Sequence, residues 1–172
     1  TVGIVGTGHI GCAAARLFRA FGARVLGYAR HESAAAREAG VEFVGLGELL
    51  ASSDIVSLHL PLNDETRGWF DADKISAMRD GAVLVNCARG AIVDNDALAA
   101  ALNAGKLAGA GIDVFDMEPP LSEGYALAHA KNCVLTPHVA FLTEEAMERR
   151  AVIEFDNVRA WLEGHPENVC EL

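Results

Sequence analysis

Basic residues are scarce in this chain of 172 residues: Lys and Arg number 14, against 24 Asp and Glu, and the formal net charge is −10. The few Lys and Arg residues form no cluster along the sequence. Nucleic acids and anionic membrane surfaces are bound through clustered positive charge. We therefore expect neither as a partner, and a phosphate group would have to be held by local backbone N–H groups.

Cysteine is also scarce, and no apolar run approaches the ~20 residues of a membrane span. The four cysteines, Cys12, Cys87, Cys133 and Cys170, are widely and irregularly spaced, with no C-x-x-C pair. This spacing argues against a disulfide framework and against a zinc site. We expect reduced thiols, a cytoplasmic protein, no membrane association and no bound metal.

Short apolar runs alternate with longer amphipathic stretches, and 51% of the residues are hydrophobic. Several runs are continuously apolar, which is typical of strands buried on both faces of a parallel sheet. The alternation predicts an α/β fold: a doubly wound parallel sheet of about seven strands with helices on both faces. The strands are expected at residues 2–5, 24–28, 41–44, 54–58, 82–86, 109–114 and 133–136.

Helical periodicity predicts helices between these strands, at residues 10–21, 32–39, 46–52, 71–78 and 95–104. A last helix follows the final strand, since Thr143 can cap it and Gly164 can end it. Residues 117–130 form the main irregular stretch. The length suits one domain, residues 1–172.

The first strand runs directly into Gly6-Thr7-Gly8-His9-Ile10-Gly11, and a helix follows. In a Rossmann-like dinucleotide-binding turn, Gly6 would permit the tight turn, Gly8 would let the backbone approach a pyrophosphate, and Gly11 would let the helix pack on the strand. Backbone N–H groups at the helix start would then hold the phosphates. A tight turn without a ligand is the alternative, although the flanking strand and helix favour the binding motif.

The end of the second strand bears on the choice between NAD and NADP. Folds that bind NAD usually place an acid there for the ribose hydroxyls, whereas this chain has Ala29 followed by Arg30. Without a carboxylate a 2′-phosphate is not repelled, and Arg30 could pair with it. We expect NAD or NADP, with NADP slightly favoured, unless Arg30 stacks on adenine or lies in solvent.

Three further blocks carry a family resemblance: LVNCARGAIVD at residues 84–94, GIDVF at 111–115 followed by Glu118 and Pro119, and TPHVA at 136–140. With the glycine motif before them, in this order, they resemble the D-isomer-specific 2-hydroxyacid dehydrogenases. The resemblance covers essentially the whole chain. It implies an NAD(P)-dependent oxidoreductase domain that interconverts a 2-oxo acid and a D-2-hydroxy acid by hydride transfer.

The residues themselves suit such chemistry. Arg89 follows a buried strand at the sheet edge where open α/β folds bind ligands, and a guanidinium suits the carboxylate and carbonyl of a 2-oxo acid. A surface Arg paired with Asp94 is the alternative for Arg89. His138 also follows a strand, and imidazole exchanges protons near neutral pH. Glu118 could orient this ring and stabilise its charged form.

The resemblance implies that Arg89 binds the carboxylate and polarises the keto oxygen, that His138 is the acid/base, and that Glu118 raises its basicity. Asp113 would contact the nicotinamide end, and the turn with His59 and Pro61 would line the cofactor. Cys87 would serve in packing or backbone contact. The full set of expected cofactor contacts is Gly6, Gly8, His9, Ile10, Gly11, Ala29, Arg30, His59, Pro61, Thr66, Cys87, Arg89, Asp113, His138 and Ala140.

The resemblance also implies that the N-terminal part of a substrate domain is absent from this chain. We therefore expect the isolated chain to bind a dinucleotide but to turn over slowly or not at all. A homodimer is expected for the full-length protein. An NADH-sensing, corepressor-like binding module without turnover is the main alternative function. Related enzymes acting on formate or phosphite, and a structural domain with a dead site, are the others.

Overall fold

The computed structural model describes residues 1–117 and 120–169. The chain divides into two units, Thr1–His138 and Val139–Leu172, and each is described by itself. The first unit contains the sheet and the glycine-rich turn. The second contains the last helix.

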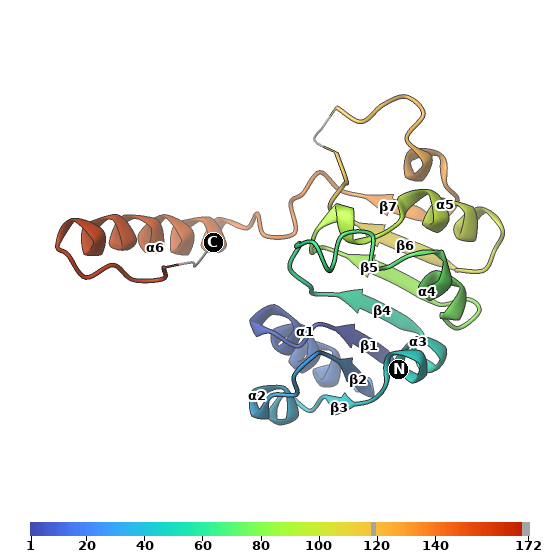
Figure 1. Cartoon of the computed structure of the whole chain (residues 1–172), viewed down its shortest axis with the longest axis horizontal. Helices are drawn as coiled ribbons and strands as arrows, with labels where there is room; N and C mark the ends of the chain where they lie inside the picture. The colour runs from blue at the N-terminus through green and yellow to red at the C-terminus, as the bar shows by residue number, and fades with distance from the viewer. Residues whose placement is uncertain (118–119, 170–172) are drawn as a thin grey trace. The chain divides into compact units, whose positions relative to one another are not determined.

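One parallel sheet of seven strands is formed within the described residues. Its spatial order is β3-β2-β1-β4-β5-β6-β7 (Figure 1). The order reverses between β1 and β4, so their carboxyl ends form the switch point where open α/β sheets bind ligands. The prediction of a doubly wound parallel sheet is confirmed. The strands are β1 (Val2–Val5), β2 (Val25–Tyr28), β3 (Glu42–Phe43), β4 (Ile55–Leu58), β5 (Val83–Asn86), β6 (Gly109–Ile112) and β7 (Cys133–Leu135).

Helices connect these strands, and several begin where a short polar side chain caps them. Ser33, Asp71 and Asp94 each accept a hydrogen bond from the backbone N–H three residues later, which satisfies a donor that the first turn leaves open. The helices of the first unit are α1 (His9–Ala20), α2 (Ala34–Glu38), α3 (Leu46–Ser52), α4 (Ala72–Ala77) and α5 (Asn95–Asn103), with 3₁₀ turns η1 (Gly90–Ile92) and η2 (Ala126–His129).

Two buried clusters lie on opposite faces of the sheet, because neighbouring residues of a strand point to opposite sides. Along β1, Ile4 packs with the α1 and α2 side chains, whereas Val5 packs with α3, α4 and α5. The first cluster comprises Val2, Ile4, Cys12, Ala15, Val25, Ala36, Ala39 and Val41. The second is larger and includes Leu49, Ile75, Leu84 and Leu98. Helices on both faces are therefore confirmed, and these clusters hold β1 and β4 in place at the switch point.

Two sequence-based expectations need correction. The edge strand β3 pairs over only two residues, Glu42 and Phe43. Before them the Val41 N–H donates to the Ala36 carbonyl at 3.0 Å, and after them the Val44 N–H still donates to the Gly27 carbonyl of β2 at 3.1 Å. The stretch expected to be irregular contains η2, whose Leu127 is buried in the larger cluster. Tyr125 is buried in the same cluster, so apolar burial accompanies the ordered turn in this segment.

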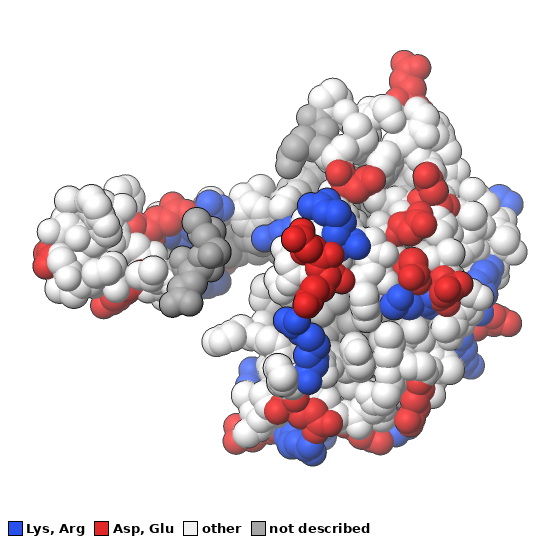
Figure 2. Space-filling view, viewed as in Figure 1, with Lys and Arg blue, Asp and Glu red and all other residues white. Residues whose placement is uncertain are grey.

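The second unit is built on α6 (Glu144–Leu162). The Thr143 hydroxyl accepts a hydrogen bond from the Ala146 N–H, which confirms the predicted cap at the start of α6. Gly164 has a positive φ of 83° just beyond the end of the helix. Within the described part of the chain, no helix combines the length and the apolar character that crossing a bilayer requires. Over the sheet-containing unit, Figure 2 shows Lys and Arg interspersed with Asp and Glu on the visible face.

Candidate active site

The turn between β1 and α1 forms a cradle of backbone at the switch point. Gly6 has a φ of +94°, and a Cβ there would also collide with the His59 carbonyl. A Cβ at Gly11 would overlap the Gly6 carbonyl oxygen, so glycine is needed for helix and turn to pack. A Cβ at Gly8 would meet nothing within 4 Å. Gly8 thus faces open space and leaves the first N–H groups of α1 without a side-chain cap, which fits a bound pyrophosphate.

A cavity of about 520 Å³, the larger cavity, opens in front of this cradle. Its walls come from the β1–α1 turn, from the end of β2 and from the loop after β4. Seven of the expected cofactor contacts line it: Gly6, Gly8, Ala29, Arg30, His59, Pro61 and Thr66. The structure therefore brings together three segments that are far apart in the sequence.

Three other expected contacts lie outside the larger cavity. His9 lines a separate hollow with Cys12 and Arg16, Ile10 is 73% exposed on α1, and Gly11 is buried beneath the turn. These positions lie around the glycine-rich turn rather than on the wall facing Arg30.

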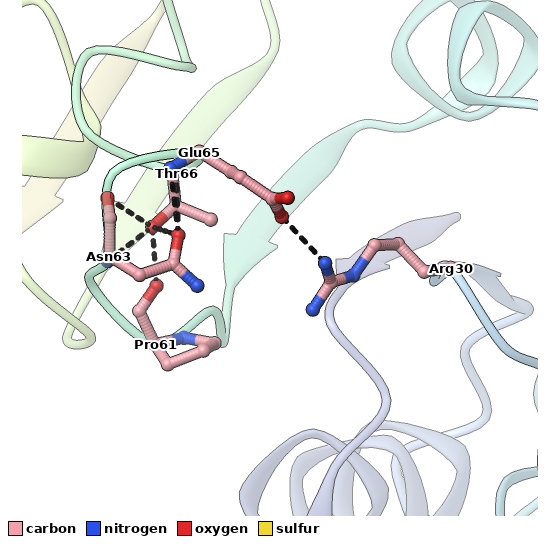
Figure 3. Close-up of polar contacts among 5 residues, drawn as sticks. All are labelled: Arg30, Pro61, Asn63, Glu65 and Thr66. Carbon is pink, nitrogen blue, oxygen red and sulfur yellow. Dashed lines mark hydrogen bonds and ion pairs between the residues drawn. The ribbon is translucent and has the colours of Figure 1, made fainter. Parts of the chain in front are cut away.

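Tyr28, Trp69 and Glu65 also line the larger cavity, and none of them was among the contacts expected from the sequence. The rings of Tyr28 and Trp69 stack with centroids 6.3 Å apart and planes 9° from parallel. Glu65 reaches from the loop after β4, and its carboxylate pairs with the Arg30 guanidinium at 2.6 Å (Figure 3). Tyr28 stands next to Ala29, but no local pattern indicates Glu65 or Trp69, because their place depends on how β4 lies beside β1.

The loop carrying Glu65 is fixed by side-chain hydrogen bonds. The Asn63 Oδ1 atom accepts from the N–H groups of Glu65 and Thr66 at 3.1 and 3.0 Å. The Thr66 hydroxyl donates to the Pro61 carbonyl at 2.7 Å and accepts from the Asn63 N–H at 2.8 Å. These bonds close a tight turn at the residues that precede and follow Glu65 (Figure 3).

His59 lies on the wall of the larger cavity at the end of β4. Its Nε2 atom is 3.0 Å from the Ser57 hydroxyl oxygen. Burial lowers the pKa of His59 below the usual 6.5, because desolvation disfavours the charged imidazolium. The ring is therefore neutral at pH 7.

A second cavity, of about 370 Å³, contains both Arg89 and His138. The turn that presents Arg89 is held by Asn86, whose Oδ1 accepts from the Ala88 N–H and whose Nδ2 donates to the Arg89 carbonyl, each at 3.0 Å. The Arg89 guanidinium donates to the Ala88 carbonyl at 2.7 Å. Asp94, the alternative partner, instead caps α5 through the Ala97 N–H. A second guanidinium, that of Arg67, lines the same cavity.

His138 is exposed at the end of β7 and has a φ of 56°, a left-handed backbone conformation that is uncommon for a residue other than glycine. Its N–H donates to the Thr136 carbonyl at 3.0 Å. Asp113 is buried beside this segment and accepts a hydrogen bond from the Thr136 hydroxyl at 2.5 Å. Glu118, expected beside His138, lies outside the described residues.

Besides His9, Ile10 and Gly11, three of the expected contacts line neither cavity. Asp113 is buried, Cys87 is exposed, and Ala140 belongs to the second unit. Partial desolvation, and secondarily the Asp113 charge, raise the pKa of the Cys87 thiol. This thiol is therefore protonated at neutral pH, as expected for a residue with no nucleophilic role.

Backbone hydrogen bonds tie the loop after β4 to the segment after Arg89. The Gly68 N–H donates to the Ala91 carbonyl at 2.8 Å, and the Phe70 N–H donates to the Ile92 carbonyl at 2.9 Å. The Asp94 N–H donates back to the Phe70 carbonyl at 3.1 Å. The wall of the larger cavity and the base of Arg89 thus share one short ladder.

Comparison with known proteins places these features in a family. The model of the D-isomer specific 2-hydroxyacid dehydrogenase NAD-binding domain matches residues 1–140. A hydroxypyruvate reductase of Blautia hydrogenotrophica is 38% identical over 168 residues, 98% of this chain and 52% of that protein.

Solved structures agree. A D-lactate dehydrogenase of Treponema pallidum has a TM-score of 0.93 at 38% identity, covering 99% of this chain and 55% of that one. The Aquifex aeolicus D-lactate dehydrogenase complexed with NAD and lactic acid has a TM-score of 0.87 at 35% identity, covering 95% and 54%. The chain spans about half the length of the curated relatives it matches.

Proposed function

The chain belongs to the D-isomer specific 2-hydroxyacid dehydrogenase family, whose NAD-binding domain it carries, and from this we propose that the protein interconverts a 2-oxo acid and a D-2-hydroxy acid. Hydroxypyruvate reductase and D-lactate dehydrogenase, the names of the matched relatives, both describe such reactions. These names also favour an enzyme over a corepressor-like binding module.

The observation that carries the proposal is the shared cavity of Arg89 and His138. Arg89 supplies a permanent cation with two parallel N–H donors, and His138 supplies an imidazole that can donate or accept a proton. They come from the ends of β5 and β7, on either side of β6. A small anion held by Arg89 would therefore lie within the same cavity as the imidazole.

In the proposed reaction, the Arg89 guanidinium binds the substrate carboxylate and polarises the adjacent keto oxygen. The His138 imidazole gives a proton to that oxygen during reduction and takes it from the hydroxyl during oxidation. We assign to Glu118 the role of raising the basicity of His138. When bound, the nicotinamide supplies or accepts the hydride at the carbonyl carbon.

For the cofactor, the open cradle at Gly8 and the adjoining larger cavity fit a dinucleotide. The absence of an acid at Ala29 and the guanidinium of Arg30 support use of NADP, since Arg30 could pair with a 2′-phosphate. The Arg30–Glu65 ion pair works against this pairing. We therefore propose that the chain accepts both NAD and NADP.

Calorimetric titration of this chain with NADH tests the proposal first, followed by titration of the NADH-saturated chain with oxamate, an unreactive 2-oxo acid analogue. We expect oxamate to bind, and Arg89→Gln to weaken it at least about tenfold, because a hydrogen bond between charged groups contributes about 1.5–3 kcal/mol. Arg79→Gln is the matched control, since Arg79 pairs with Asp54 away from both cavities. Failure to bind NADH, or equal effects of the two variants, contradicts the proposal.

Two further proposals concern the oligomeric state and the location of the protein. Exposed apolar side chains at α1, among them Ile10 and Phe21, offer a surface for the expected homodimer, which light scattering of the purified protein would detect. The cytoplasmic location remains a prediction from the cysteine spacing.

A further inference from the structure

The larger cavity contains a carboxylate, that of Glu65, but it does not stand at the end of β2, where dinucleotide-binding folds usually place an acid. At the end of β2 the usual acidic position is Ala29. Glu65, from the loop after β4, extends across the carboxyl end of β1 and pairs with Arg30 at 2.6 Å (Figure 3). Both residues line the cavity.

The loop geometry limits how far Glu65 can withdraw. The N–H of Glu65 is bonded to Asn63 Oδ1, and the next residue, Thr66, is bonded to both Asn63 and Pro61. These hydrogen bonds hold the backbone at Glu65 in a closed turn. A dinucleotide that enters this cavity meets the Glu65 carboxylate together with Arg30.

We infer that Glu65 is a specificity-determining residue: it takes the place of the acid missing at Ala29 and limits the use of NADP. The inference rests on the proposed dinucleotide site. A 2′-phosphate must compete with Glu65 for the Arg30 guanidinium and lies near a like charge, which costs binding free energy. The 2′-hydroxyl of NAD is uncharged, so it does not compete with Glu65 for the Arg30 guanidinium, and it can donate a hydrogen bond to the Glu65 carboxylate.

The size of the effect follows from exposure. The side chains of Arg30 and Glu65 are each 72% exposed, so solvent screens their interaction and an exposed pair contributes at most about 1 kcal/mol, or about fivefold in affinity. The expected change is therefore a shift in preference between two dinucleotides rather than a loss of binding.

The experiment is a titration of the 172-residue chain with NADH and with NADPH, for the native protein, Glu65→Gln, Asp64→Asn and Arg30→Gln. Asp64→Asn is the matched control, because it removes the same charge from the neighbouring residue, which does not line the cavity. We expect Glu65→Gln to raise the ratio of Kd for NADH to Kd for NADPH by more than about twofold and by at most about fivefold. Arg30→Gln should lower that ratio, and Asp64→Asn should leave it within about twofold.

Each outcome bears on a different claim. Binding of NADH with an unchanged ratio in Glu65→Gln overturns the inference alone, as does an equal rise in Asp64→Asn, which would show a general charge effect. Binding of neither dinucleotide overturns the inference and the proposed function together. Circular dichroism of each variant confirms that this exposed loop has been changed without unfolding the chain.

Discussion

Replacing Gly8 by Ala should separate ligand binding from folding in this chain. Gly8 is the N-cap of α1, with an ordinary φ of −74°, and a Cβ there meets nothing within 4 Å. Ala is a poorer N-cap than Gly, which destabilises the folded state. Ala is also less flexible than Gly, which lowers the entropy of the unfolded state and so stabilises the fold. These opposing effects are each about 0.5–1 kcal/mol. The free energy of unfolding should therefore change by less than about 0.5 kcal/mol.

The same methyl group should strongly weaken NADH binding, because it occupies the space through which the backbone approaches the pyrophosphate. Loss of one hydrogen bond from a backbone N–H to a charged phosphate costs about 2 kcal/mol, which corresponds to about a 30-fold rise in Kd. Calorimetric titration with NADH measures the affinity, and urea unfolding followed by circular dichroism measures the stability.

Gly45→Ala provides the control for both measurements. Gly45 is the N-cap of α3, with a φ of −64°, and a Cβ there also meets nothing within 4 Å. The change is the same, but it lies outside the larger cavity, so NADH should bind normally. The reasoning is refuted when Gly8→Ala binds NADH within about threefold of the native chain, or when Gly45→Ala weakens binding as much.

Other substitutions test single contacts. Gly11→Ala should lower the free energy of unfolding by about 3 kcal/mol in urea titrations, because its Cβ overlaps the Gly6 carbonyl; stability equal to that of Gly8→Ala would contradict this. The pKa of His59 is lower in the folded chain than the ordinary 6.5, so His59 is protonated in the unfolded chain at a higher pH than in the folded chain. The free energy of unfolding is therefore unaffected by His59 well above pH 6.5 and decreases as the pH falls below 6.5. His59→Asn should flatten this slope between about pH 7.5 and pH 5.5, and an unchanged slope would show that His59 is not responsible. Iodoacetamide should modify Cys87 more slowly at pH 7 than it modifies free cysteine, since the thiol pKa is raised; faster modification would disprove that shift.

The sheet could be predicted from the sequence because its strands are short apolar runs with two buried faces. Predicted and observed bounds are identical for β1 and differ by at most two residues at either end of the other strands. An apolar run does not indicate at which residue the pairing with the neighbouring strand ends. The edge strand β3 is accordingly shorter than the strand predicted from its sequence. The 3₁₀ turn η2 was missed, since it depends on the burial of Leu127 rather than on a local signal.

The candidate site was predictable where chemistry is tied to a motif. The glycines of the first turn and the shared position of Arg89 and His138 follow from residues at the carboxyl ends of parallel strands. Glu65 and Trp69 were not predictable, because each reaches the larger cavity only through the packing of the loop after β4. Arg30 and Glu65 are 35 residues apart in the sequence, so no local motif indicates that they pair.

The short backbone ladder from Gly68 and Phe70 to the segment after Arg89 gives the two cavities a common mechanical element. These hydrogen bonds join the end of the loop that carries Glu65 and Thr66 to the backbone that follows Arg89. The cofactor-side loop and the segment that follows Arg89 are thus built on one hydrogen-bonded stretch of backbone rather than on two separate loops.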